Sequence, residues 1–184
     1  TKKQIKEFKA AEKEAEDSYG LTSLACQIAD VGDKDWAKRI YKKAESVAVD
    51  YDDFANLANS ISENLDDKKF LKDIFKKAKD RAEDSSNFLN LADSIYEKLN
   101  DKDWVKKIYK IAEGKAADYY DFNSLVDSIN ENLSDKEWVN QIKTILKIMQ
   151  PYEFSGPELT YYDSTVKEKD LSSIQKINDA ISDL

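Results

Sequence analysis

The segment Asp33–Ala44, DKDWAKRIYKKA, occurs four times in this chain of 184 residues. The other copies are DKKFLKDIFKKA at 67–78, DKDWVKKIYKIA at 101–112 and a diverged DKEWVNQIKTIL at 135–146. Successive copies lie 34 residues apart, as their large aromatic residues show: Trp36, Phe70, Trp104 and Trp138. A fixed period of this length is typical of a solenoid, in which one supersecondary unit is stacked on itself.

A second repeated segment lies between these copies. In one unit it places Phe54, Leu57, Ala58 and Ile61 at the i, i+3, i+4 and i+7 positions that form one stripe of an amphipathic helix. The same pattern begins at Leu21, Phe88 and Phe122. Each unit is therefore expected to contain two helices, and with four Gly and two Pro the chain offers few tight turns for a sheet. The predicted fold class is all-α.

Aspartate residues mark the expected helix starts. Asp33, Asp67, Asp101 and Asp135 each precede the large aromatic by three residues, where a carboxylate can accept from free N–H groups of the first helical turn. Gly32 and Asn100 stand where a left-handed helix end is favourable. Calcium binding is the alternative for such Asp-rich connections, but the ligand spacing and central glycine of an EF-hand loop are absent. Helix capping is the favoured interpretation.

Composition limits the classes of function. The chain has 29 Lys and Arg against 37 Asp and Glu, a net charge of −8, and it contains no His. An acidic chain repels nucleic acid and anionic membranes, so we expect neither as a partner. We also expect no enzyme activity, metal or cofactor, because there is no His, no base beside the single Cys26 and no Gly-rich phosphate loop.

The lone cysteine cannot form an internal disulfide, and no apolar run approaches the roughly 20 residues of a membrane span. We expect a cytoplasmic location. A removed N-terminal signal is the open alternative, because the chain begins at Thr1. The oligomeric state is left open.

The repeats predict two domains, a helical repeat domain over residues 1–150 and a C-terminal segment over 151–184. Residues 1 to about 17 are expected to form a helix that is a diverged copy of the central segment, with Phe8 in the place of Tyr41 and Ala11 in the place of Ala44. Residues 152–184 combine an irregular aromatic stretch with a final amphipathic helix, which we expect to cap the last repeat, because the end units of a solenoid otherwise expose their core. The alternative is that this tail occupies the binding groove as a built-in peptide.

The two-helix unit with its 34-residue period resembles the tetratricopeptide repeat. Phe54, Leu57, Ala58 and Ile61 match the first helix of that family, and the pattern of Ala37, Tyr41 and Ala44 matches the second. The resemblance covers roughly residues 5–149. The chain departs from the family in lacking the proline that closes each unit and the first-helix glycine, and in one extra residue between the helices of the later units.

The resemblance implies a right-handed α-solenoid of about four repeats whose first helices line a concave groove for a peptide or partner helix. The candidate groove residues stand on the flank of each first helix beside its buried stripe: Thr22, Ala29, Asn59, Ser62, Asp93, Tyr96, Asn123, Asp127 and Asn130. The set contains no Lys or Arg, so the basic residues with which some family members clasp a terminal carboxylate are missing. A neutral or basic ligand is therefore expected. Ordinary solvated positions are the alternative interpretation of these residues.

A protein-binding scaffold or adaptor is the first hypothesis for function. The second is an acidic inhibitor or immunity-type protein that neutralises a basic toxin or nuclease. Added salt separates the two, because a carboxylate-steered inhibitor loses association rate steeply whereas a groove that reads peptide backbone does not.

Overall fold

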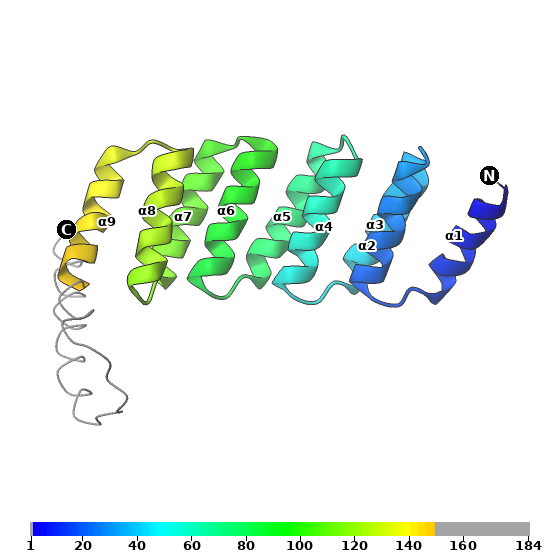
Figure 1. Ribbon diagram of the computed structural model, residues 1–184, viewed down its shortest axis with the longest axis horizontal. Coiled ribbons are helices and arrows are strands. Elements are labelled where there is room, and N and C mark those ends of the chain that lie inside the picture. Colours follow the sequence, from blue (N-terminus) through cyan, green and yellow to red (C-terminus); the bar gives the residue numbers. More distant parts are fainter. Residues whose placement is uncertain (1, 150–184) are drawn as a thin grey trace, which may run out of the picture. The chain divides into compact units, whose positions relative to one another are not determined.

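The computed structural model describes residues 2–149, and this part of the chain contains nine α-helices and no strand (Figure 1). The helices are α1 (Lys2–Glu14), α2 (Ser18–Asp30), α3 (Lys34–Val47), α4 (Tyr51–Asn64), α5 (Lys68–Arg81), α6 (Ser85–Leu99), α7 (Lys102–Lys115), α8 (Tyr119–Asn132) and α9 (Lys136–Met149). Their regular length and pairwise packing confirm the predicted α-solenoid. The expected cap at 152–184 lies outside the described residues.

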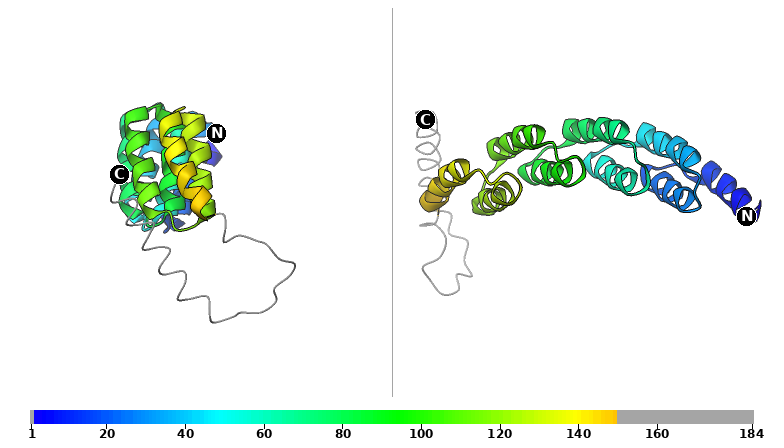
Figure 2. Two further views of the ribbon diagram at one scale, coloured as in Figure 1. Left: turned by 90° about the vertical axis from the view of Figure 1, so that its left-hand side faces the viewer. Right: turned by 90° about the horizontal axis from the view of Figure 1, so that it is seen from above.

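The chain divides into two compact units, one ending at Asp135 and the other beginning at Lys136. In the first unit the helices form two layers (Figure 2, right). The first helices of the repeats, α2, α4, α6 and α8, form one layer, and the second helices, α3, α5 and α7, form the other. In the second unit, α9 buries Trp138, Val139, Ile142 and Leu146 on one face. The division predicted near residue 150 stays a prediction.

Successive repeats in the first unit contact each other through two kinds of helix pair. Helices α2, α4 and α6 pack on the second helices of their own repeats, α3, α5 and α7, and α2 contacts α4, α4 contacts α6 and α6 contacts α8. Each second helix also contacts the first helix of the next repeat. Because the first helices are drawn together while the second helices are held apart, the row bends toward the first-helix layer (Figure 2, right).

The core lies between the two layers. Three aromatic side chains at the same register of α3, α5 and α7, Tyr41, Phe75 and Tyr109, are at most 1% exposed. Small residues at repeated positions allow the helices to approach closely. Ala25, Ala58 and Ala92 in the first helices and Ala44, Ala78 and Ala112 in the second helices are fully buried. The small residues therefore have the packing role that their repetition predicts.

Helix α1 completes the array at its N-terminal end. The rings of Phe8 on α1 and Trp36 on α3 meet edge to face, with 6.1 Å between their centroids. Two repeats later, the rings of Phe75 on α5 and Trp104 on α7 make the same kind of contact at 6.4 Å. The indole N–H of Trp36 also donates to Glu12 of α1 at 3.0 Å. Side chains of α1 thus meet α3 as those of α5 meet α7, which supports the prediction that α1 is a diverged copy of the central segment.

The aspartates before the helices are N-caps, as predicted. The carboxylates of Asp33, Asp67 and Asp101 accept from the backbone N–H of Trp36, Phe70 and Trp104 at 2.9 to 3.1 Å. The first helices are capped in the same way, by Asp17, Asp50, Asp84 and Asp118. At the opposite ends, Gly32 and Asn100 adopt the expected positive φ values of 91° and 52°. Local chemistry therefore sets the helix boundaries.

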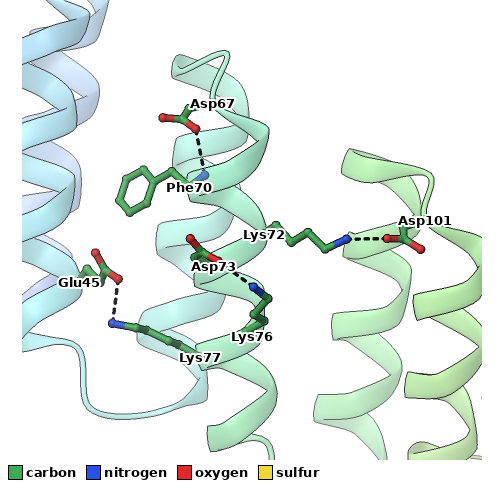
Figure 3. Close-up of polar contacts among 8 residues, drawn as sticks. All are labelled: Glu45, Asp67, Phe70, Lys72, Asp73, Lys76, Lys77 and Asp101. Atoms are coloured by element: carbon green, nitrogen blue, oxygen red, sulfur yellow. Dashed lines mark hydrogen bonds and ion pairs between the residues drawn. The ribbon is translucent and has the colours of Figure 1, made fainter.

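Cross-repeat ion pairs connect the second-helix layer. Lys38 pairs with Asp67 at 2.6 Å, Lys72 with Asp101 at 2.9 Å and Lys106 with Asp135 at 2.8 Å. Figure 3 shows Lys72 reaching Asp101 on one side of α5, while Lys77 reaches Glu45 on the other side at 2.8 Å. The lysine and the backbone N–H together lower the pKa of the Asp101 carboxyl, with the lysine as the larger cause. Each such pair is partly exposed and contributes little stability alone.

The core assignment predicts the cost of a truncation at its centre. Leu91 of α6 is 2% exposed, so Leu91→Ala leaves a cavity and should lower the free energy of unfolding by about 2 to 5 kcal/mol. Urea unfolding followed by circular dichroism measures this. Val49→Ala is the control, because Val49 is 70% exposed and its truncation should cost under about 0.5 kcal/mol. If Leu91→Ala lowers the free energy of unfolding by less than about 1 kcal/mol, the assignment of Leu91 to the core is wrong.

Candidate functional site

The surface proposed to bind a partner is the solvent side of the first-helix layer, which we call the first-helix face. Two registers of each first helix lie opposite its buried stripe, because positions 56 and 63 are about 160 to 180° from the direction of Phe54 and Ile61 at 100° per residue. We define the face by these registers. It consists of Ser23, Asn56, Asn90 and Ser124 and of Asp30, Glu63, Glu97 and Glu131, all of them exposed.

A carboxylate therefore recurs once per repeat on this face. The four first helices together carry nine acidic residues and one basic residue, Lys98. The three second helices of the same unit carry seventeen basic and six acidic residues. The net charge of the whole chain therefore does not reveal that these two layers have opposite sign. An approaching basic segment meets a favourable potential on the first-helix face and an unfavourable one on the other side.

The predicted groove residues fall into two groups. Asn59, Asn123, Asp127 and Asn130 are exposed and border the first-helix face. Their polar groups also bond locally, since Asn123 donates to Asp127 at 3.3 Å. Ser62, Asp93 and Tyr96 are half-buried. The first group is open to a ligand, and the second is engaged with neighbouring side chains.

Two of the half-buried residues have clear internal partners. The Ser62 hydroxyl donates to the backbone oxygen of Asn59 at 2.7 Å. The ring of Tyr96 lies under the ammonium group of Lys102, 5.8 Å from the ring centroid. An aromatic ring already in contact with a cation presents less free surface to a ligand.

Asp93 has a structural role at the junction of three helices. Its carboxylate accepts hydrogen bonds from the hydroxyl of Tyr109 on α7, from Ser128 on α8 at 3.1 Å and from the amide of Asn132 on α8 at 2.9 Å. Burial, together with the neighbouring carboxylate, raises the pKa of the Tyr109 phenol. The Asp93 carboxylate thus holds successive repeats together, and its acceptor capacity is largely occupied.

A related cluster occurs 68 residues earlier in the chain. There the Tyr41 hydroxyl lies 3.4 Å from the sulfur of Cys26 and donates to the backbone oxygen of Ser60 at 3.3 Å. Asn64 donates to the same backbone oxygen at 2.8 Å. At the junction between these two clusters the aromatic is Phe75, which has no hydroxyl to share. Polar clusters therefore alternate with an apolar junction along the array.

One flank candidate does not reach the surface. Thr22 is 6% exposed, and its hydroxyl has no hydrogen-bond partner among the described residues. Helical angles alone predict Thr22 on the groove side, but it lies in the core because α2 is packed against α1, α3 and α4. Ala29, the other α2 candidate, is half-buried.

The candidates predicted from the sequence lie beside the buried stripe and do not include the carboxylate register opposite to it, Asp30, Glu63, Glu97 and Glu131. The signal was present, because an acidic residue recurs at this register in all four first helices. A charged residue that recurs with the repeat period indicates an exposed register shared by all the first helices.

Metal sites and membrane-spanning helices were also considered for the described residues. Within 2–149, no group of three or more His, Cys, Asp or Glu side chains could hold a metal ion. Among the described helices, none has both the length and the apolar run needed to cross a bilayer.

Fold and surface together define the class as a helical-repeat α-solenoid with an acidic first-helix layer. Comparisons with protein-family models, with curated proteins and with solved structures found no match to this chain.

The Asp93 cluster predicts a measurable loss of stability. Tyr109→Phe removes the hydroxyl that Asp93 and Asn132 contact, and it should lower the free energy of unfolding by about 1 to 3 kcal/mol, because buried polar groups lose a partner. Chemical denaturation provides the measurement. Tyr120→Phe serves as the control, since Tyr120 is 71% exposed and its change should be under about 0.5 kcal/mol. Equal values for the two variants would contradict a structural role for the cluster.

Proposed function

We propose that the chain is a tetratricopeptide-repeat-like interaction scaffold whose first-helix face binds a neutral or basic segment of a partner protein. The observation that carries the proposal is the exposed carboxylate present once per repeat on that face. Solenoids of this class bind partners along extended surfaces of this kind. The proposal gives the chain a binding role and no reaction.

The distribution of charge favours a basic segment over a neutral one. Asp30, Glu63, Glu97 and Glu131 stand at equivalent positions, so they are spaced by the packing of successive first helices. Side chains of Lys or Arg at intervals along an extended segment could meet one carboxylate per repeat. Exposed Asn59, Asn123 and Asn130 beside this stripe can hydrogen-bond the backbone of the bound segment.

The acidic inhibitor remains the second candidate, because the same carboxylates could complement the basic active site of a toxin or nuclease. The two candidates differ in kinetics. Raising the salt from about 20 to about 200 mM shortens the screening length several-fold and should lower the association rate steeply for a charge-steered inhibitor. A segment held by backbone hydrogen bonds as well as by the carboxylates should lose less of its association rate and keep part of its affinity at the higher salt.

The first test uses a fluorescent twelve-residue peptide of alternating Lys and Ser, with a Gln and Ser peptide as its neutral counterpart. Fluorescence anisotropy at low salt should show tighter binding of the basic peptide. The triple variant Glu63→Gln, Glu97→Gln, Glu131→Gln should weaken that binding by about tenfold or more, because it removes three of the four carboxylates.

A matched variant controls for net charge. Glu14→Gln, Asp35→Asn, Asp103→Asn also removes three exposed carboxylates, but none belongs to the first-helix face. It should change the affinity for the basic peptide by less than about twofold. The proposal fails if this variant loses as much affinity as the first-helix-face variant, or if the native chain does not prefer the basic peptide.

A further inference from the structure

The opposite side of the first unit carries a regular lattice of lysines. Each second helix has three of them at i, i+4 and i+8, and the set repeats with the 34-residue period. The nine residues are Lys34, Lys38 and Lys42 on α3, Lys68, Lys72 and Lys76 on α5, and Lys102, Lys106 and Lys110 on α7. We call the surface formed by these nine lysines, together with exposed Lys107 beside them on α7, the lysine face. Eight of the nine are exposed and Lys38 is half-buried.

Helix geometry places each set of three on one side of its helix. A step of four residues advances about 6 Å along the axis and turns only about 40° beyond one full turn. The lysines therefore form a row along each of α3, α5 and α7, and the packing of successive repeats sets these rows side by side. Figure 3 shows two members of the middle row, Lys72 and Lys76, along α5.

The carboxylates of this layer are mostly committed to the solenoid itself. Asp67 and Asp101 each accept a backbone N–H at a helix start and a lysine from the preceding second helix. Several cations remain beyond this internal pairing. Lys42, Lys68 and Lys107, one on each second helix, are exposed and have no ion-pair partner among the described residues.

The lysine face is also hollowed. A depression of about 390 Å³ lies between α5 and α7, and it is lined by Lys72, Lys76, Lys79, Lys107, Trp104, Asp101 and Asp103. A depression of about 570 Å³ lies at the equivalent place between α1 and α3, beside Trp36 and Arg39. Both follow from the wider separation of the second helices. The first is large enough to receive acidic side chains. Of its four ammonium groups, those of Lys72, Lys76 and Lys79 also pair with Asp101, Asp73 and Asp80, while Lys107 has no ion-pair partner among the described residues.

The chemistry of this face favours carboxylates over phosphates. It is built from Lys, and the whole chain has only two Arg, although the planar guanidinium is the group best suited to phosphate recognition. Trp36 and Phe70 are each 8% exposed, and the half-buried ring of Trp104 already lies under the ammonium group of Lys72, 5.1 Å from its centroid. These rings therefore offer little surface on which a base could stack. A flat lipid surface would meet only part of a face that bulges outward (Figure 2, right).

We propose that the lysine face binds an extended acidic segment of a second partner protein. Alternate residues of an extended chain lie about 6.6 to 6.8 Å apart, close to the rise of about 6 Å between successive lysines of one row. A segment with Asp or Glu at alternate positions thus follows a row, and carboxylates enter the depression beside Trp104. The chain then joins a basic partner on one face to an acidic partner on the other.

The test uses a fluorescent twelve-residue peptide of alternating Glu and Ser and the full chain. Anisotropy at about 20 mM salt should show binding that weakens steeply near 200 mM, because exposed charges are then screened. Lys42→Glu, Lys68→Glu, Lys107→Glu places one reversal on each second helix and should weaken binding by at least about tenfold. Circular dichroism confirms that each variant is folded.

The matched control is Lys2→Glu, Lys6→Glu, Lys13→Glu, which makes the same change of net charge on α1, outside the lysine face. It should alter the affinity by less than about twofold. An equal loss in both variants would overturn the proposal. So would absence of binding at low salt, tighter binding of a twelve-nucleotide single-stranded DNA than of the acidic peptide, or self-association of the chain that competes with the peptide.

The failure of this proposal is distinguishable from failure of the proposed function. The variant Glu63→Gln, Glu97→Gln, Glu131→Gln should not weaken binding of the acidic peptide, whereas it should weaken binding of the basic one. The lysine-face variant should likewise not weaken binding of the basic peptide. If each variant weakens both peptides, neither face has the separate role assigned to it.

Discussion

The structure of the first unit depends on mutual burial between neighbouring repeats. Each helix hides its apolar stripe against the helices beside it, and a repeat taken alone would expose Phe54, Leu57 or their equivalents to water. The fully buried Tyr41, Phe75 and Tyr109 lie between the two layers. Because burial by neighbours is the main source of stability, the sides of the layers that face water are free to vary in charge.

Repeated aspartates fix where the second helices begin and how successive repeats contact each other. Asp67 and Asp101 each begin a helix through a backbone hydrogen bond and also bind a lysine of the previous second helix. One carboxylate thereby fixes both a helix boundary and a contact between repeats. The individual ion pairs are weak because they are partly exposed. Their regular recurrence explains why the second-helix layer carries acidic caps as well as many lysines.

The separation of charge has consequences for function. The first-helix layer is acidic and the second-helix layer is basic, so we propose a different class of partner for each of the two surfaces. Net charge alone conceals this arrangement, since the two layers partly cancel. A scaffold with two such faces can hold two partners at once without their competing for the same residues. This is the form of activity that the described surfaces support best.

The sequence determined the repeat, the two-helix unit and the helix ends, because these depend on residues within a few positions of each other. The spacing of Phe54 and Ile61 fixes a helical stripe, and Asp33 or Gly32 acts on the adjacent turn. Only the tertiary structure decided the role of side chains on the flanks of the first helices. Asp93 and Asn59 occupy equivalent positions, yet Asp93 meets Tyr109, Ser128 and Asn132 while Asn59 is exposed. The difference comes from residues 16 to 39 positions away, whose proximity arises only when successive repeats pack together.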